Sequence, residues 1–239
     1  MDKDNGTSPL YPVRIIAHIR TDFDTKFGVP RQSGLADSLE GRIVFEPPYR
    51  NPDALRGLED FSHLWLIWQF SKAVREGWSP TVRPPRLGGN TRMGVFATRS
   101  PFRPNAIGLS SVRLLRLEHD TPEGPVIWVA GADLMDGTPI LDIKPYLPYT
   151  DSHPDATGGF AEPLRGYSLA VTYAPGTLEK VPEEKRAGLE QVLAQDPRPA
   201  YQDDPDHIYG FSFAGLEVKF TVREGVLTVQ SVEENTKKG

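Results

Sequence analysis

The stretch Leu64-Trp65-Leu66-Ile67-Trp68-Gln69-Phe70 is apolar and aromatic at every position except one glutamine. A short apolar run of this length is typical of a β-strand that is buried on both faces. The chain also has 23 prolines among its 239 residues, about twice the usual share of ~5%, which leaves little room for long helices. The stretch and its surroundings therefore predict a mainly β fold.

Short segments of a similar kind recur along the chain, separated by loops rich in glycine and proline. Residues 13–20 alternate apolar and polar side chains, as in a strand with one face in a core. The other segments that we expect to form strands are residues 42–45, 94–98, 109–117, 126–134 and 167–173. Many short strands between Gly/Pro turns favour a β-barrel or a β-sandwich.

The pattern changes after about residue 175. Acidic residues beginning with Glu183 open a predicted helix, which ends before Pro197. The apolar face of this helix carries Leu189, Val192 and Leu193. A predicted meander with turns at Gly215 and Gly225 follows, and its strands are residues 209–213, 217–222 and 226–232. We therefore expect a second, smaller α+β domain.

Composition excludes several classes of protein. The chain has no cysteine, which excludes disulfides, thiolate metal sites and cysteine nucleophiles, and its five histidines lack metal-ligand spacing. No run approaches the ~20 apolar residues of a membrane span, and the first residues lack the apolar region of a signal peptide. The motifs of P-loop and Rossmann-type sites are absent. We expect a cytoplasmic protein with no metal and no membrane partner.

Charge is divided unevenly along the chain. The formal net charge of −5 argues against a nucleic-acid partner, because phosphate binding usually requires a basic surface. However, residues 77–117 contain seven arginines and no other ionised residue, whereas residues 118–162 contain nine acids and only Lys144. One hypothesis is that the two blocks face each other as a layer of ion pairs. The other is that the arginines bind phosphates or carboxylates of a ligand.

The arginine block is densest at residues 92–109. We expect a strand to end at Thr98 and a loop stiffened by prolines to follow, with Arg99, Phe102, Arg103 and Asn105 on it. Rigid loops of this kind present binding groups at fixed positions. Arginine side chains on such a loop suit carboxylates and phosphates, and they also stack on bases.

A second dense polar stretch covers residues 133–148. Asp133 follows an apolar run, so we expect it at the end of a strand, and Asp136 precedes Gly137 in a turn signal. Asp142 and Lys144 would share one face of an extended segment. Carboxylates at strand ends accept hydrogen bonds from a ribose or an amine, but aspartate before glycine is also a common turn former. Both interpretations stay open.

Four segments are informative together: F-G-V-P-R-Q-S-G-L at 27–35, R-G-L-E-D-F-S-H-L-W at 56–65, P-T-V-R-P-P-R-L-G-G-N-T-R-M-G-V-F-A-T-R-S-P-F-R-P-N-A-I-G-L at 80–109, and D-L-M-D-G-T-P-I-L-D-I-K-P-Y-L-P at 133–148. They closely resemble the TsaA-like tRNA methyltransferases, also called the TrmO family. A further segment, L-A-Q-D-P-R-P-A-Y at 193–201, resembles the bacterial two-domain form. The resemblance covers nearly the whole chain.

The resemblance implies an enzyme that uses S-adenosylmethionine (SAM) to methylate N6 of N6-threonylcarbamoyladenosine (t6A). This modified base lies at position 37 of tRNA, and the product would be m6t6A. The implied fold is a SAM-binding β-barrel domain over residues 1–160, followed by a small α+β C-terminal domain over residues 161–239 that helps to hold tRNA. The resemblance also implies a homodimer.

The same resemblance implies site residues. Those implied to contact SAM are Pro30, Arg31, Gln32, His63, Leu64, Arg92, Leu109, Asp133, Leu134, Met135 and Asp136. Our hypothesis for the hydrogen-bond acceptor near the target amine is Asp142 or Asn105. The candidate contacts with tRNA are Arg83, Arg86, Arg99, Arg103, Arg113, Lys144, Tyr146 and Arg198. Arg99 and Arg103 suit either a phosphate or the SAM carboxylate, and this choice stays open.

Two other functions also stay open from the sequence. One is a non-catalytic tRNA-binding module on the same barrel, and the other is a SAM-sensing module that does not bind RNA. The first would bind tRNA without turnover, and the second would bind SAM alone.

Overall fold

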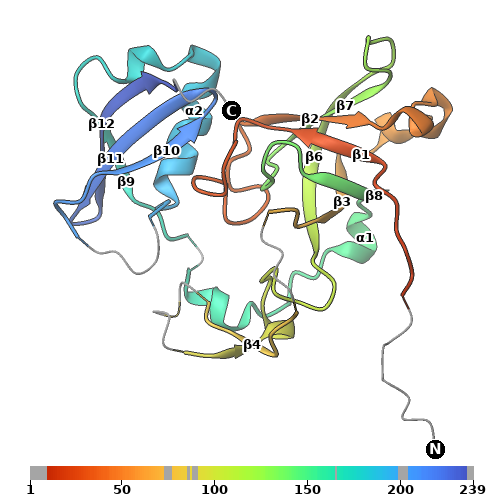
Figure 1. Ribbon diagram of the computed structural model, residues 1–239, viewed down its shortest axis with the longest axis horizontal. Coiled ribbons are helices and arrows are strands. Elements are labelled where there is room, and N and C mark those ends of the chain that lie inside the picture. The colour runs from red at the N-terminus through yellow and green to blue at the C-terminus, as the bar shows by residue number, and fades with distance from the viewer. Residues whose placement is uncertain are drawn as a thin grey trace, which may run out of the picture.

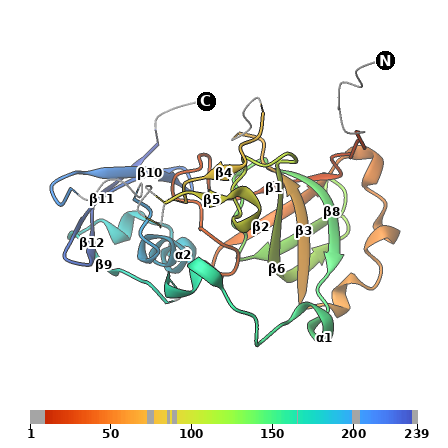
Figure 2. The same cartoon turned by 90° about the horizontal axis from the view of Figure 1, so that it is seen from below.

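The computed structural model describes residues 10–72, 77–84, 87, 91–164, 166–198 and 204–235. A closed β-barrel and a smaller β-sheet lie side by side (Figure 1). Helix α2 (Glu183–Ala194) packs against the smaller sheet, as the turned view also shows (Figure 2). This architecture confirms the mainly β fold class predicted from the sequence.

Six antiparallel strands close the barrel in the order β1-β2-β7-β6-β3-β8. Buried aliphatic side chains such as Ile19, Ile43 and Ile140 fill its interior. Closure pairs every strand on both sides and leaves no open sheet edge. The strands are β1 (Ala17–Arg20), β2 (Glu40–Phe45), β3 (His63–Gln69), β6 (Ile107–Glu118), β7 (Val126–Ala130) and β8 (Pro139–Pro145).

β3 is buried on one face only, which corrects the expectation of a strand buried on both faces. Leu64, Leu66 and Trp68 are buried and alternate with partly exposed residues. Side chains alternate across a strand, so a barrel strand has one inner and one outer face. The outer Trp65 packs against Tyr146, with ring centroids 5.5 Å apart. The apolar outer positions are therefore covered by neighbouring side chains, not by a second sheet.

Short elements connect the strands. They are η1 (Pro47–Tyr49), η2 (Pro52–Leu55), η3 (Leu58–Asp60), β4 (Thr81–Val82), β5 (Met93–Gly94), η5 (Val95–Ala97), α1 (Pro148–Asp151), η6 (Gly159–Leu164) and η7 (Leu178–Lys180). The strand expected over residues 13–20 begins only at Ala17, because residues 10–15 are exposed. The strand expected over residues 126–134 ends at Ala130, because Gly131 turns the chain with a φ of 76°.

The strand expected over residues 94–98 is wrong. β5 ends at Gly94 after pairing with β4, and the 3-10 turn η5 follows. Val95 is buried, whereas Phe96 is 71% exposed. The Thr98 hydroxyl donates to the Val95 carbonyl at 2.9 Å and closes the turn. The run forms a turn because the Thr98 N–H and hydroxyl both donate back to the Val95 carbonyl, which a strand would offer to a neighbouring strand.

The smaller sheet has the order β10-β11-β12-β9. β10, β11 and β12 form the predicted meander, with left-handed turns at Gly215 (φ 77°) and Gly225 (φ 78°). β9 pairs in parallel with β12, so the strand expected over residues 167–173 belongs to this sheet and not to the barrel. The bounds are β9 (Ala170–Tyr173), β10 (Tyr209–Phe213), β11 (Leu216–Arg223) and β12 (Val226–Glu234).

The core of the smaller sheet includes residues from the loop between β1 and β2. Phe23, Ala36 and Leu39 are buried together with residues of α2 and the meander. The ring centroids of Phe23 and Phe213 lie 5.8 Å apart. Gly28 passes so close to Phe211 that a Cβ would lie 2.2 Å from its ring. The loop over residues 21–39, which carries Arg31 and Gln32, is therefore held between the barrel and the smaller sheet.

Candidate cofactor cavity and basic groove

A cavity of about 760 Å³ lies at one end of the barrel. Its walls come from the β1–β2 loop, the end of β3, the loop between η5 and β6, the start of β6 and the β7–β8 loop. Ile107 and Leu109 are 41% and 53% exposed and present apolar surface to it. Gly108 lies between them, and a Cβ there would be 2.2 Å from the Trp68 ring, so glycine lets β6 approach β3 closely. This volume suits a small organic ligand.

The carboxylate of Asp133 belongs to the wall of this cavity. The Ser110 hydroxyl donates to Asp133 and accepts a hydrogen bond from the Trp68 indole at 2.9 Å. Burial raises the pKa of Asp133 above its usual value, although the Ser110 hydrogen bond and the charge of Arg99 act in the opposite direction. A carboxylate that has lost much of its water is a strong acceptor for a ligand hydroxyl or amine.

A larger groove of about 1580 Å³ adjoins the cavity. Among the described residues that line it there are five cations and no acid, the cations being Lys26, Arg31, Arg83, Arg92 and Arg99. Aromatic side chains, including Trp78 and Phe96, supply apolar surface between these charges. A concave surface of one charge sign concentrates ligands of the opposite sign. The groove therefore suits an anionic ligand with flat apolar parts.

The cavity and the groove share one wall, made of Lys26, Arg31, Gln32, Thr98, Arg99 and Pro101. Arg99 donates to the side-chain oxygen of Gln32, which joins the 92–109 loop to the β1–β2 loop. Arg103 donates to the Thr98 carbonyl at 2.8 Å and holds the loop from within. A ligand in the cavity and a ligand in the groove would both lie beside the Arg99 guanidinium where they reach this wall.

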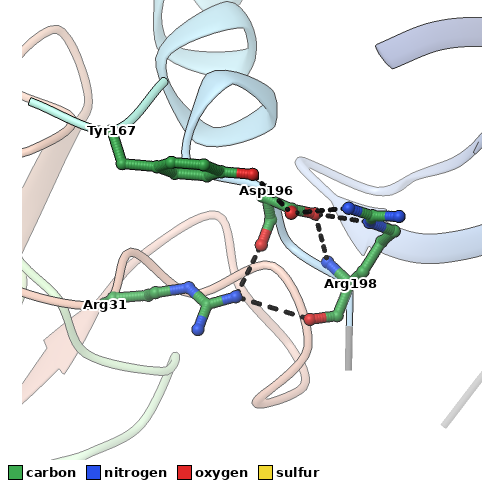
Figure 3. A network of polar contacts seen from close by, with 4 residues as sticks. All are labelled: Arg31, Tyr167, Asp196 and Arg198. Atoms are coloured by element: carbon green, nitrogen blue, oxygen red, sulfur yellow. Dashed lines mark hydrogen bonds and ion pairs between the residues drawn. The ribbon is translucent and has the colours of Figure 1, made fainter. Parts of the chain in front are cut away.

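Arg31 ties the shared wall to the C-terminal part of the chain (Figure 3). Its guanidinium donates to the Asp196 carbonyl at 2.6 Å and to the Arg198 carbonyl at 3.4 Å. The Asp196 carboxylate accepts from the Arg198 guanidinium at 2.8 and 2.9 Å and from the Tyr167 hydroxyl at 3.3 Å. Burial raises the pKa of Asp196, but the Arg198 hydrogen bonds and charge outweigh burial and lower it. The end of α2 therefore positions the β1–β2 loop, which lines both the cavity and the groove.

The acidic block is not a layer that neutralises the arginine block. Arg116 pairs with Glu118 at 3.1 Å and lies over the Trp128 ring at 4.0 Å. Other acids of the block pair with cations outside residues 77–117: Glu123 with Arg42, Asp136 with Arg20, and Asp142 with Lys144. Arg83, Arg92 and Arg99 of the arginine block line the groove instead, an arrangement that favours the hypothesis of a bound ligand.

The part of the chain that the structure describes contains neither a metal-ligand cluster nor a membrane-spanning helix. No group of three or more His, Asp or Glu side chains there is arranged to hold a metal ion. None of the helices in those segments combines the length and apolar character that crossing a bilayer requires.

Two family models match the chain. The tRNA-methyltransferase O N-terminal domain matches residues 18–152, and the TrmO C-terminal domain matches residues 167–235. The chain belongs to the tRNA-methyltransferase O family. Membership confirms the resemblance found in the sequence and the enzyme class that it implies, a tRNA methyltransferase.

Relatives and solved structures agree with this family. The tRNA (adenine(37)-N6)-methyltransferase of Escherichia coli K12 is 43% identical over 226 residues, which is 91% of this chain and 96% of the relative. The enzyme of the same name from Eikenella corrodens is 49% identical over 173 residues, or 72% and 97%. A crystal structure of TrmO matches with a TM-score of 0.76 and 36% identity, covering 94% of this chain and all of the other.

Seven of the residues implied for SAM line the cavity. They are Pro30, Arg31, Gln32, Leu109, Asp133, Leu134 and Met135. They come from three loops and strands that are far apart in the sequence, and barrel closure brings them together.

Four of the residues implied for SAM lie elsewhere. Leu64 is fully buried in the barrel interior, and Arg92 lines the groove. Asp136 accepts from the backbone N–H of Thr21 at 3.1 Å and pairs with Arg20. His63 is at the opposite end of β3 from the cavity, roughly 20 Å away at the usual rise of a strand.

The two candidates for the amine acceptor differ in position. Asn105 lies on the exposed loop between Arg103 and Ile107, both of which line the cavity. Asp142 lies on β8 and pairs with Lys144 at 2.9 Å, as their shared face predicted. Neither residue of this pair lines the cavity or the groove.

The candidate tRNA contacts separate into two groups. Arg83 and Arg99 line the groove, and Arg103 lines the cavity. Tyr146 packs on Trp65 and Arg113 donates to the Asp37 carbonyl, both outside the two hollows. The side chain of Arg198 is only 14% exposed and pairs with Asp196, so it offers little to a phosphate. Arg86 lies outside the described residues.

The sequence patterns did not single out three side chains that line the cavity or the groove, Trp68, Trp78 and Phe96, or the buried Ser110, which donates to Asp133. Ser110 is a small polar residue in an apolar strand, which is a signal of a buried hydrogen-bond partner. Trp78 and Phe96 carried no such signal, because an aromatic residue in a loop reads equally well as core.

Proposed function

We propose that this protein transfers a methyl group from SAM to N6 of t6A at position 37 of tRNA, giving m6t6A. The observation that supports this most is the wall at Arg99, which a cavity with a buried carboxylate shares with a cationic groove. A base held at this wall has a small-ligand site on one side and phosphate-binding side chains on the other. Transfer of a small group to a nucleobase requires this juxtaposition.

The residues of the cavity suit SAM by their chemistry. Apolar side chains such as Leu109 and Leu134 match its adenine, Asp133 is an acceptor for its ribose hydroxyls, and Arg99 matches its carboxylate. When bound, SAM supplies an electrophilic methyl group. The chain itself orients the target amine and excludes water, and orientation alone contributes up to about 7–11 kcal/mol to rate enhancement.

Asn105 is our choice for the acceptor that orients the target amine, because its loop borders the cavity. Asn105→Ala is expected to lower the single-turnover rate of methylation by about tenfold, the value of one neutral hydrogen bond. SAM affinity should stay unchanged. Asp142→Ala is the comparison: a larger loss for Asp142→Ala than for Asn105→Ala would transfer the role to Asp142.

Arg83 is expected to contact a tRNA phosphate. Because each neutralised phosphate releases counterions, Arg83→Ala should reduce the slope of log K against log salt concentration by about 0.7. Binding of a t6A-containing anticodon stem-loop, measured at several salt concentrations, gives the slope. Arg56→Ala is the matched control, because Arg56 is an exposed arginine outside the groove that pairs with Asp53. An unchanged slope in Arg83→Ala would remove Arg83 from the RNA-binding surface.

Mass spectrometry of anticodon-loop nucleosides tests the reaction and the substrate together. The protein and SAM are incubated with tRNA that carries t6A and with the same tRNA lacking it. We expect a nucleoside heavier by one methyl group only from the first. Product from both would limit the function to adenine-37 methylation, and product from neither, with tRNA still bound, would favour the non-catalytic module.

A homodimer, the cytoplasm as location, and tRNA binding by residues 161–239 are parts of the same proposal. His63 and Tyr146 pack together far from the cavity of their own chain. A second copy would bring this end of one barrel to the cavity of the other, which would account for the SAM contact implied for His63. The mass of the protein in solution tests the homodimer.

A further inference from the structure

Two large aromatic side chains lie exposed at the groove. Trp78 is 51% exposed and Phe96 is 71% exposed. Their rings are stacked, with centroids 6.2 Å apart and an interplanar angle of 24°. Exposed apolar surface of this size is uncommon on a folded protein unless it meets a partner.

The pair is held in place by the backbone. The Val95 N–H donates to the Pro80 carbonyl at 3.0 Å, and the Ser79 N–H donates to the Phe102 carbonyl at 3.3 Å. Val95, next to Phe96, is 1% exposed and anchors the turn η5 in the interior. The two rings therefore stand on fixed segments and lose little freedom when a ligand binds.

The charges around the pair indicate what this ligand is. The described residues lining the groove are cationic or neutral, and the Arg103 guanidinium lies 5.9 Å from the centre of the Phe96 ring. Cations that track a backbone, combined with aromatic rings that stack bases, are typical of proteins that bind single-stranded nucleic acid. A purely apolar partner would gain nothing from these arginines.

We propose that Trp78 and Phe96 form a stacking platform for an unpaired nucleobase of the RNA substrate, next to the base that is methylated. Phe96 lies two residues before Thr98, and Thr98 belongs to the wall that the groove shares with the cavity. One base would add to the aromatic stack while its neighbour reaches the wall. This inference rests on the proposed function, because it assumes an RNA substrate.

Alanine variants of the pair test the platform. Trp78→Ala and Phe96→Ala should each weaken binding of an anticodon stem-loop by about 5- to 150-fold, the range measured for one stacked base. The slope of log K against log salt should stay unchanged, because stacking releases no counterions. Trp78→Phe should retain most of the affinity. Tyr11→Ala is the control, because Tyr11 is an 86% exposed aromatic residue outside the groove.

A second measurement separates stacking from other roles. RNA should quench tryptophan fluorescence in the wild type, and most of this quenching should disappear in Trp78→Phe while RNA still binds. Equal RNA affinity of the wild type and a Trp78→Ala/Phe96→Ala double variant would overturn the inference, as would a change in the protein's mass in solution, which would make the pair a contact between copies. If the wild type itself does not bind RNA, the proposed function fails with it. If the wild type methylates the tRNA and the alanine variants bind RNA as tightly as the wild type does, the stacking platform is wrong and the proposed function stands.

Discussion

Asp133→Asn is expected to weaken SAM binding by about 10- to 100-fold, as measured by calorimetric titration of the protein with SAM. Asp133 belongs to the cavity wall, and its carboxylate, which accepts from Ser110, has capacity for a further hydrogen bond from a ligand hydroxyl. Losing a charged hydrogen-bond acceptor costs about 1.5–3 kcal/mol, and every 1.4 kcal/mol is a factor of about ten. The amide keeps the volume and one acceptor oxygen, so the cavity shape is preserved.

The same substitution is expected to stabilise the protein without SAM at neutral pH. The pKa of Asp133 is raised in the folded state, so the folded protein binds this proton more tightly than the unfolded chain does. Ionised Asp133 therefore costs stability above its folded pKa, and this cost disappears as pH falls below the unfolded value of about 3.9. Thermal unfolding should show a higher midpoint for Asp133→Asn at pH 7 and no difference at the acidic end.

The exposed Asp155 provides the control for Asp133. Asp155→Asn should change neither SAM affinity nor the unfolding midpoint. If Asp133→Asn bound SAM as tightly as the wild type, the carboxylate would have no role in holding the ligand. A lower unfolding midpoint of Asp133→Asn at pH 7 would mean that Ser110 and Arg99 stabilise the ionised carboxylate by more than its burial costs.

Asp196→Asn is expected to lower the free energy of unfolding at neutral pH by about 2–3 kcal/mol, as measured by urea denaturation. The Asp196 and Arg198 side chains are only 16% and 14% exposed, so the substitution removes a charged hydrogen-bond acceptor from a nearly buried guanidinium. Asparagine tolerates the left-handed backbone of this position (φ 56°), so the substitution adds no backbone strain. The effect therefore reports the loss of the carboxylate charge, which Arg198 and Tyr167 both contact.

The pH dependence of Asp196 has the opposite sign to that of Asp133. The pKa of Asp196 is lowered in the folded state, so its contribution is present above the unfolded value of about 3.9 and is lost as pH falls through the folded pKa. The gap between wild type and Asp196→Asn should close at low pH. Asp206→Asn, in an exposed pair with Arg223, should cost less than about 0.5 kcal/mol. An equal loss in both variants would contradict a special role for Asp196.

Local sequence patterns predicted the elements whose causes are local. The turns at Gly215 and Gly225 require left-handed backbone, which glycine adopts without strain, and the meander follows from them. Helix α2 begins at acidic residues and ends before Pro197, as the sequence predicts. The sequence did not predict the turn η5, because the apolar run at residues 94–98 resembles a strand and the hydrogen bonds from Thr98 back to Val95 leave no apolar pattern in the sequence.

The sequence by itself determined the mainly β fold, the family and the segregation of arginines from acids. Glycine and proline positions, the spacing of apolar residues and long motifs are all local features that can be recognised along the chain. Only the tertiary structure decided that Arg31 and Arg99 share a wall while Arg198 is enclosed by an ion pair. It also placed Asp133 against Ser110 and Trp68. The physical reason is that barrel closure pairs strands far apart in the sequence, and the resulting burial sets which charges remain available to a ligand.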